Sequence, residues 1–303
     1  MTEIGADRLV DAVSRLMLFG QPTTRGGAKR FIDFARHQGY ALDQCWALVD
    51  RRGRIAHAVL ALPNPGRTAL LFVSAALDDP DPLADLLAAV TPQLDPARVV
   101  VAQALLSHEQ RDEYEAFSRA GFTRLADLAY MERLAPKPSA IAPPDWPQGC
   151  VIETWSPEND ADFATAVKRS YVETHDCPGL CGLRSIADIM RGHRSAGVFD
   201  PSMWTLVRMQ GAPAAALLLS PMSEQRMVEL TYIGVDPDFR SLGLARRLVN
   251  RALSLVAHRH ERTVTLAVDE RNEPALRLYR QAGFYRTDRR VALIHPIPRT
   301  ARS

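Results

Sequence analysis

Hydrophobic and polar residues alternate along the chain with two periods, the two-residue period of strands and the longer period of helices. In the second half, three apolar segments separated by short polar turns predict an antiparallel meander over Met203–Met209, Ala212–Leu219 and Met227–Val235. Helical spacing then covers Leu244–Val256, and a β-branched strand follows at Thr263–Val268. The remaining elements expected in this half are strands at Val151–Trp155 and Tyr285–Ile294 and helices at Glu158–Val172, Arg184–His193 and Ala275–Ala282.

The first half has a similar order of elements. Its expected helices are Leu9–Phe19, Ala28–His37, Leu83–Leu94 and Glu109–Ala120, and its expected strands are Cys45–Asp50, Ile55–Leu62, Thr68–Ala75, Val99–Gln103 and Phe122–Met131. A local match supports duplication, because residues 117–124 and residues 279–286 share an aromatic residue followed by the pattern x-x-Ala-Gly-Phe-x-Arg. We therefore expect an internal repeat.

A proline-rich stretch separates the halves. Five of the chain's 21 prolines fall within residues 135–149, which favours an extended linker. The sequence thus predicts domains at residues 1–134 and 150–303. We expect an α/β (α+β) fold in which each domain has a mainly antiparallel, twisted sheet flanked by helices.

Composition narrows the class of protein. A chain of 303 residues with 47% hydrophobic and 24% charged residues is typical of globular proteins, and its length favours two domains. A net charge of +2 gives no basic footprint for nucleic acid, and the apolar runs are too short to span a membrane. The first residues lack the pattern of a secretory signal, and four cysteines do not indicate a disulfide framework. We expect a cytoplasmic protein.

One segment, residues 229–245, has the features of a pyrophosphate site. A strand ends at Val235, Pro237 turns the chain, and a helix begins near Gly243. The first backbone N–H groups of a helix have no intrahelical partner, and the helix dipole adds positive charge there. Gly243 leaves these groups uncovered, Ala245 is small, and Arg240 adds a cation, so the segment can hold a pyrophosphate. The simpler alternative is an ordinary turn with an exposed arginine.

This segment and a second one together resemble the GNAT superfamily of acyl-coenzyme A-dependent N-acyltransferases. The first signature is Val235-x-Pro237-x-x-Arg240-x-x-Gly243-x-Ala245, and the second is Asn272-x-x-Ala275-x-x-Leu278-Tyr279-x-x-x-Gly283-Phe284. The resemblance implies tandem GNAT-like domains, with acetyl-CoA lying between two splayed strands of the second one. The cofactor-binding residues it implies are Ile233, Gly234, Val235, Arg240, Ser241, Leu242, Gly243, Leu244, Ala245 and Asn272.

Two side chains are candidates for proton transfer. By strand periodicity, Glu229 shares a face with Thr231, Ile233 and Val235. The resemblance implies that Glu229 is the general base and that Tyr279 protonates the departing thiolate. The alternatives are a solvated or ion-paired glutamate and a tyrosine packed in the core.

The first half lacks these groups. The strand at residues 68–75 runs into an acidic segment without arginine or glycine, and carboxylates repel a pyrophosphate. No glutamate occurs from Ile4 to His108, and Phe117 takes the place of Tyr279. We expect a degenerate copy without cofactor that completes or shields the second domain, or helps to form the acceptor cleft.

The polar segment at residues 170–184 is the candidate acceptor site, again by resemblance. Its candidate substrate-binding residues are Tyr171, His175, Asp176 and Arg184. A turn with buried cysteines remains an alternative. A metal site from His175, Asp176, Cys177 and Cys181 is disfavoured, because the Cys-x-x-Cys spacing of zinc sites is missing, and no metal is expected.

The sequence thus predicts an N-acetyltransferase that moves an acetyl group from acetyl-CoA directly to an amine. The acceptor stays open among a small amine or amino-sugar, an α-amino terminus of a peptide, and a thiol-sugar amine of the mycothiol type. A non-catalytic acyl-CoA sensor or scaffold is the alternative, and a partner-binding module based on the first half is another. Tandem domains can take the place of a dimer, so a monomer is favoured.

Overall fold

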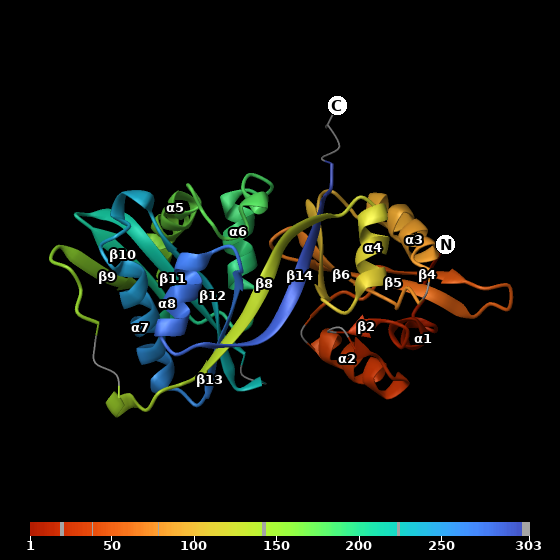
Figure 1. Ribbon diagram of the computed structural model, residues 1–303, viewed down its shortest axis with the longest axis horizontal. Helices are drawn as coiled ribbons and strands as arrows, with labels where there is room; N and C mark the ends of the chain where they lie inside the picture. Colours follow the sequence, from red (N-terminus) through yellow and green to blue (C-terminus); the bar gives the residue numbers. More distant parts are fainter. Residues whose placement is uncertain (19–20, 38, 78, 141–143, 223–224, 299–303) are drawn as a thin grey trace. The chain divides into compact units, whose positions relative to one another are not determined.

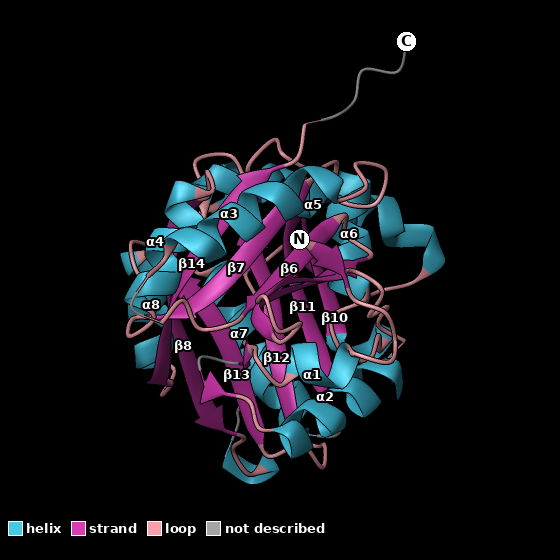
Figure 2. Ribbon diagram, turned by 90° about the vertical axis from the view of Figure 1, so that its right-hand side faces the viewer, coloured by secondary structure: helices cyan, strands magenta, loops and turns pink. Residues whose placement is uncertain are grey.

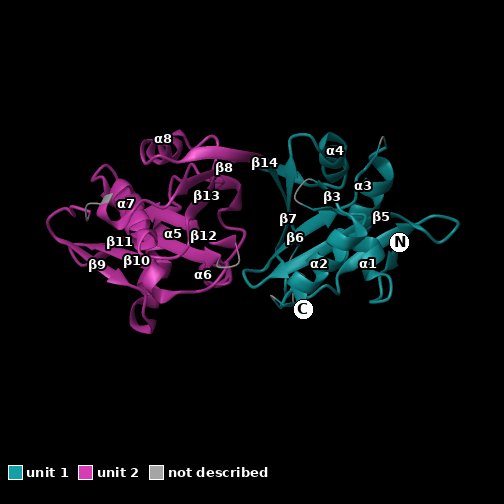
Figure 3. Cartoon of the chain, turned by 90° about the horizontal axis from the view of Figure 1, so that it is seen from below, with its two compact units in different colours: residues 1–126, 290–303 teal, residues 127–289 magenta. Residues whose placement is uncertain are grey.

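The computed structural model describes residues 1–18, 21–37, 39–77, 79–140, 144–222 and 225–298 (Figure 1). The chain forms two compact units, the first made of Met1–Ala126 with Arg290–Ser303 and the second of Asp127–Arg289 (Figure 3). In both, helices pack against a mixed, mostly antiparallel sheet, which confirms the expected fold class (Figure 2).

The second unit has the strand order β8-β13-β12-β11-β10-β9. Neighbouring strands are antiparallel except β12 and β13, which are parallel. Its elements are β8 (Thr123–Leu134), β9 (Cys150–Thr154), α5 (Asp160–Ser170), α6 (Ile186–Arg194), β10 (Trp204–Met209), β11 (Ala212–Met222), β12 (Met227–Val235), α7 (Leu244–Ala257), β13 (Thr263–Asp269), α8 (Glu273–Gln281) and the start of β14 (Tyr285–Pro296).

Two hydrophobic clusters hold this unit together, one on each face of its sheet. On one face, Leu248 and Val256 of α7 pack with Leu217 of β11, and Tyr279 of α8 joins them. On the other face, Phe163 of α5 is fully buried with the side chains of β10 and β11. Each fully buried large side chain contributes about 1.5–3 kcal/mol. The alternation along the strands therefore places α7 and α8 opposite α5 and α6.

The first unit repeats this plan with the order β1-β4-β5-β6-β7-β14. Its β6 and β7 are parallel, as β12 and β13 are. Its elements are β1 (Thr2–Glu3), α1 (Leu9–Val13), β2 (Met17–Leu18), β3 (Gln21–Pro22), α2 (Arg25–His37), β4 (Cys45–Val49), β5 (Ile55–Asn64), β6 (Thr68–Val73), α3 (Asp81–Val90), β7 (Val101–Ser107) and α4 (Arg111–Arg119).

The helix expected over Leu9–Phe19 is shorter in the structure. It ends at Val13, and Met17–Leu18 pairs with β3 instead. Leu16 is fully buried and forms an isolated bridge to Ser74, so the chain leaves the helix to bury this side chain against the sheet. Phe19 lies outside the described residues.

The two halves of the sequence exchange their closing strands, so that each half supplies the last strand of the other unit's sheet. Leu128–Leu134 of β8 pairs antiparallel with β13, and Arg290–Pro296 of β14 pairs antiparallel with β7. The units therefore differ from the expected division at residues 134 and 150. Both closing strands follow the same Ala-Gly-Phe motif and have similar apolar patterns, so the sequence does not tell which sheet each one completes.

The described part of the proline-rich stretch packs on the second unit. The Ala135 N–H donates to the Arg262 carbonyl at 2.9 Å, and Trp146 joins the α7 cluster. A short 3₁₀ turn covers Pro138–Ala140, where no regular element was expected. Across the described residues, no helix has both the length and the apolar character that crossing a membrane requires.

Candidate active site

The parallel strands β12 and β13 separate after a short contact. Only Met227–Glu229 of β12 pairs with Thr263–Thr265 of β13, so the rest of β12 has no partner on that side. A cavity of about 560 Å³ opens there. Its lining includes residues 230–235 of β12, residues 239–241 and 243–245 of the following turn, Asn272 and Tyr279 of the α8 region, and residues 170, 171 and 173–176.

A β-bulge at Thr231 corrects one expectation about Glu229. Leu218 of β11 lies opposite Tyr232 and Leu219 opposite Leu230, so Thr231 is an extra residue. Before the bulge, Leu230 faces the α7 cluster, and after it Ile233 does so. Glu229 therefore points to the face covered by α5 and α6, and the expectation that it shares a face with Ile233 and Val235 was wrong. The inserted residue shifts the alternation by one position.

The Glu229 carboxyl group is half-buried, and no cation in the described part of the chain pairs with it. Among the described residues, nothing forms a hydrogen bond or ion pair with it, and burial raises its pKa. A carboxyl group whose pKa is raised toward neutrality is a better proton acceptor at physiological pH than an exposed one. Glu229 does not line the cavity itself.

The Tyr279 side chain projects from α8 and forms part of the cavity wall. Only 4% of the residue is exposed, and its ring packs edge-on against Phe284 with centroids 5.8 Å apart. No residue that the structure describes hydrogen-bonds its hydroxyl, and burial raises its pKa, with a further contribution from Asp176. The phenol therefore stays protonated at neutral pH and is available as a donor.

The turn after β12 has the backbone that an anion site needs. Gly243 is the N-cap of α7 with φ of 72°, in the left-handed region that glycine favours. The first N–H groups of α7 therefore face the cavity without intrahelical partners. Ala245 and Leu244 line the cavity, whereas Leu242 is exposed and does not.

The Arg240 guanidinium binds protein carbonyls in the structure. Its Nη2 donates to the Val172 carbonyl at 2.7 Å and to the Ser170 carbonyl at 3.3 Å, and its Nε donates to Val235 at 3.3 Å. Arg240 thus ties the end of α5 to the turn, where a cation favourably meets a helix C-terminus. Its charge still lies at the cavity edge.

Asn272 caps α8. Its Oδ1 accepts the Ala275 N–H at 3.3 Å, and the residue also lines the cavity. The side-chain amide has two further donors in its NH₂ group, so capping does not exhaust its capacity.

An aromatic cluster forms the opposite wall. The Tyr232 hydroxyl lies 2.5 Å from the Ser170 Oγ, and its ring contacts Tyr171 at 5.8 Å and His193 at 5.2 Å between centroids. Burial raises the pKa of Tyr171 to about 12 and lowers the pKa of His193 to about 4. These groups are therefore neutral at pH 7.

Asp176 joins the acceptor segment to the end of β13. Its Oδ1 accepts the Asp269 N–H at 3.0 Å, and the Cys177 N–H donates to Asp269 Oδ2 at 3.3 Å. Burial raises the pKa of Asp176, and the negative charge of the nearby Asp269 raises it further. Of the described residues, no three His, Cys, Asp or Glu side chains form a metal-binding group.

The cavity brings together most of the residues singled out in the sequence. Tyr171, His175 and Asp176 line it, whereas Arg184 does not. Sequence reasoning missed Ser170 and Tyr232, which also line it. The signal available in the sequence was Tyr232 itself, which lies in the strand that ends at the first signature.

The corresponding place in the first unit is occupied by a side chain. β6 and β7 also pair over three residues and then separate. There the buried Glu113 of α4 accepts the Ala76 N–H at 2.8 Å, in the turn that follows β6. In the second unit, the matching position of α8 is Ala275.

Splayed parallel strands, a bulged strand and a glycine-capped helix together define the GNAT acyltransferase fold. Residues 174–284 match the model of the acetyltransferase (GNAT) family. The chain is 34% identical over 169 residues to a mycothiol acetyltransferase of Kineococcus radiotolerans, a match that covers 56% of this chain and 54% of that protein. The chain thus spans about half the length of the curated relatives it matches.

Two solved structures share the fold along nearly the whole chain. A GCN5-related N-acetyltransferase from Sphaerobacter thermophilus gives a TM-score of 0.64 at 19% identity and covers 96% of this chain and 91% of its own. A tandem GNAT protein from the clavulanic acid biosynthesis pathway gives a TM-score of 0.57 at 18% identity. The match covers 98% of this chain and 97% of that chain. The expected tandem GNAT-like fold is therefore confirmed.

Proposed function

We propose that the second unit is an N-acetyltransferase that uses acetyl-CoA and a small amine acceptor. The observation that carries this proposal is the cavity between β12 and β13, where the splayed strand edge, the α7 N-terminus and the Tyr279 hydroxyl meet. Its volume of about 560 Å³ is in the usual range for small-molecule sites. The residues present fit the cofactor, because Gly243 leaves the first N–H groups of α7 open to a pyrophosphate.

The roles of the side chains follow from their surroundings. Glu229, which has a raised pKa and no cation beside it, takes the proton from the acceptor ammonium, through water because it stands back from the cavity. Backbone N–H groups of β12 near Ile233 polarise the thioester carbonyl. Tyr279 gives its proton to the departing thiolate. Attack is direct, without an acyl-enzyme.

The first acceptor to assay is a thiol-sugar amine of the mycothiol type. This choice rests on the name that the curated relatives carry. Tyr171, His175 and Asp176 line the cavity at the acceptor segment and are the groups that contact this amine.

We also propose that the first unit takes no cofactor. Its counterpart of the pyrophosphate turn already gives the Ala76 N–H to Glu113, and a second anion there would be repelled. One molecule of acetyl-CoA should therefore bind per chain.

Calorimetric titration of acetyl-CoA tests binding, and Gly243→Glu tests the location. The variant places a carboxylate at the α7 N-terminus and should abolish binding. Gly211→Glu is the matched control, since Gly211 also has positive φ and lies in an open turn. Equal loss in both variants, or two molecules bound per chain, contradicts the proposal.

Turnover is tested by measuring acetyl transfer from acetyl-CoA to a panel of amines, with wild type and two conservative variants. Glu229→Gln and Tyr279→Phe should each lower kcat by about 10²–10⁴-fold while leaving acetyl-CoA binding unchanged. Binding without turnover of any amine favours the acyl-CoA sensor instead.

A further inference from the structure

Two hydroxyl groups of the acyl-transfer cavity form a chain that ends at α5. The Ser170 Oγ donates to the Val167 carbonyl at 2.8 Å, and the Tyr232 hydroxyl lies 2.5 Å from that Oγ and 3.4 Å from the same carbonyl. Val167 and Ser170 belong to the last turn of α5, where carbonyl groups lack helical partners and accept other donors. The chain therefore runs from the cavity wall to the end of a helix.

The Tyr232 proton is directed at protein atoms rather than at the cavity. Each of the two hydroxyl groups has one proton, and the Val167 carbonyl can only accept. Whichever hydroxyl donates to Val167, the Tyr232 proton points to Ser170 or to Val167. No further residue that the structure describes hydrogen-bonds to the Tyr232 oxygen, so one of its lone pairs stays open in the cavity wall.

Tyr232 also keeps its proton at neutral pH. Burial raises the pKa of Tyr232, and the nearby Tyr171 and Asp176 raise it further. The His193 ring beside it is neutral, because burial lowers the pKa of His193 to about 4. Tyr232 therefore offers the cavity an uncharged hydrogen-bond acceptor and no donor.

The Tyr232 oxygen lies beside the strand residue Gly234. A Cβ on Gly234 would be 2.7 Å from this oxygen, so the glycine leaves room for it over the strand. The bulge at Thr231 turns Tyr232 to the same face of β12 as Glu229, the face covered by α5 and α6. Because the proposed site of the thioester carbonyl is the backbone of β12 near Ile233, Tyr232 stands where an amine would approach it.

We infer that the Tyr232 oxygen accepts a hydrogen bond from the acceptor nitrogen and thereby selects primary amines, an inference that rests on the proposed acetyl transfer. A primary ammonium has three N–H bonds. One proton goes to Glu229, and a second replaces the proton that Tyr279 gives to sulfur, while the nitrogen bonds to the acyl carbon and the carbon–sulfur bond breaks. The third N–H stays in the amide product, and Tyr232 holds it from binding to release.

A secondary amine has no N–H to keep. Its ammonium form has two N–H bonds and loses both protons in the transfer, so an alkyl group would stand against the Tyr232 oxygen. A site built to hydrogen-bond an N–H group rejects a ligand without it, because the polar group of the site is left unpaired. The expected discrimination between primary and secondary amine is at least about 10-fold.

Amine binding is measured first, by calorimetry on the full-length protein. D-glucosamine and L-cysteinamide are titrated with and without CoA, which has no acetyl group to transfer, and at least one should bind with a Kd of about 10 mM or tighter. Tyr232→Phe keeps the ring and should weaken this binding about 10-fold, while acetyl-CoA binding stays unchanged.

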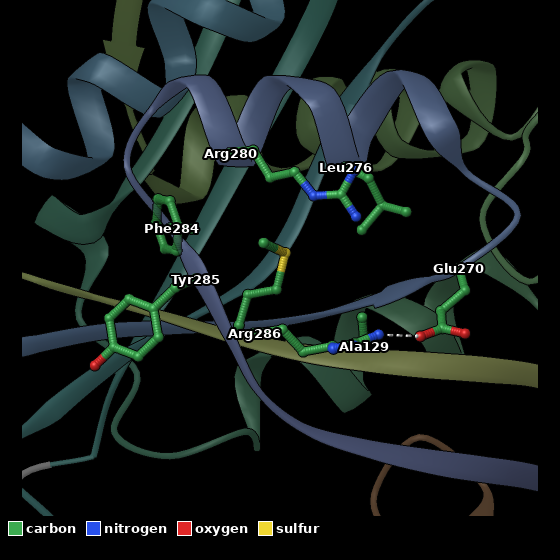
Figure 4. Close-up of a pocket in the computed structure, with 8 residues that line it drawn as sticks. Ala129, Glu270, Leu276, Arg280, Phe284, Tyr285 and Arg286 are labelled. Atoms are coloured by element: carbon green, nitrogen blue, oxygen red, sulfur yellow. Dashed lines mark hydrogen bonds and ion pairs between the residues drawn. The ribbon is translucent and has the colours of Figure 1, made fainter.

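Tyr285→Phe is the matched control for loss of a phenol hydroxyl. Tyr285 lines a separate cavity between β8, α8 and the start of β14, and its hydroxyl binds Glu132 (Figure 4). This variant should bind the amine as wild type does.

Acetyl transfer is then measured with the amine that binds and with its N-methyl derivative. Wild type should prefer the primary amine at least about 10-fold in kcat/KM, and Tyr232→Phe should bring this ratio close to one. Damage to the fold alone would lower both rates and keep the ratio.

The inference is overturned if neither amine binds, if Tyr232→Phe binds the amine as wild type does, or if its preference for the primary amine is unchanged. Amine binding that depends on Tyr232 without any acetyl transfer would instead overturn the proposed function and leave the hydrogen bond in place.

Discussion

Gly234 is a position where the surrounding atoms leave no room for a single added methyl group. A Cβ at this residue would lie 2.7 Å from the Ser170 Cβ and 2.7 Å from the Tyr232 hydroxyl, and would also meet the Ser170 Oγ. The Ser170 Cβ is fixed to the backbone of α5 and cannot turn away. Gly234→Ala therefore overpacks the contact, at about 1–3 kcal/mol, and breaks the Ser170–Tyr232 hydrogen bond, at about 1 kcal/mol. The expected loss of stability is about 2–4 kcal/mol.

Urea denaturation of four proteins measures this effect: wild type, Gly234→Ala, Ser170→Gly and the double variant. Ser170→Gly removes the two clashing atoms of Ser170, leaves the Tyr232 hydroxyl free to move away, and costs about 1 kcal/mol by itself. The double variant should then be at least about 1 kcal/mol more stable than the sum of the single effects predicts. A Gly234→Ala protein within about 0.5 kcal/mol of wild type, or additive single effects, would refute the packing argument.

Three further predictions concern Glu229, Glu113 and the exchanged strand. Burial raises the pKa of Glu229 above its unfolded value, so the stability gained from its protonated form is full below the unfolded pKa and is lost as pH rises through the folded one. Glu229→Gln should therefore be more stable than wild type at about pH 8 and equal to it at about pH 4 in urea denaturation; the opposite order would contradict the desolvation. Glu113→Ala should cost about 1–3 kcal/mol, because the Ala76 N–H loses its acceptor, whereas Glu113→Gln keeps an oxygen there and costs less; equal losses by thermal denaturation would argue against this role. A fragment of residues 127–289 should give a dispersed NMR spectrum, whereas residues 150–289 lack β8 and should aggregate; a folded shorter fragment would show that β8 is dispensable.

The element order and the turn that leads from β12 into α7 could be predicted from the sequence. Both depend on local patterns, namely helical spacing and a glycine at the start of the helix. The parallel pairing of β12 and β13 agrees with the helix that connects them, because parallel neighbours need a crossover connection.

The orientation of Glu229 could not be predicted in the same way. A bulge inserts one residue without changing composition or periodicity nearby, and Thr231 is as suitable for a regular strand as for a bulge. The partners of Arg240 were also out of reach, because they are carbonyl groups from residues about 70 positions earlier in the chain.

The exchanged strands have a consequence for how the chain is synthesised. The ribosome releases β7 long before it releases Arg290–Pro296, the strand that pairs with it. Until Arg290–Pro296 emerges, the edge of β7 stays open, and an open edge is a template for unwanted pairing with other chains. The second unit has no such delay, because β8 precedes the rest of its sheet. The nascent chain therefore completes the second unit first, and the sheet of the first unit closes only after Arg290–Pro296 has emerged.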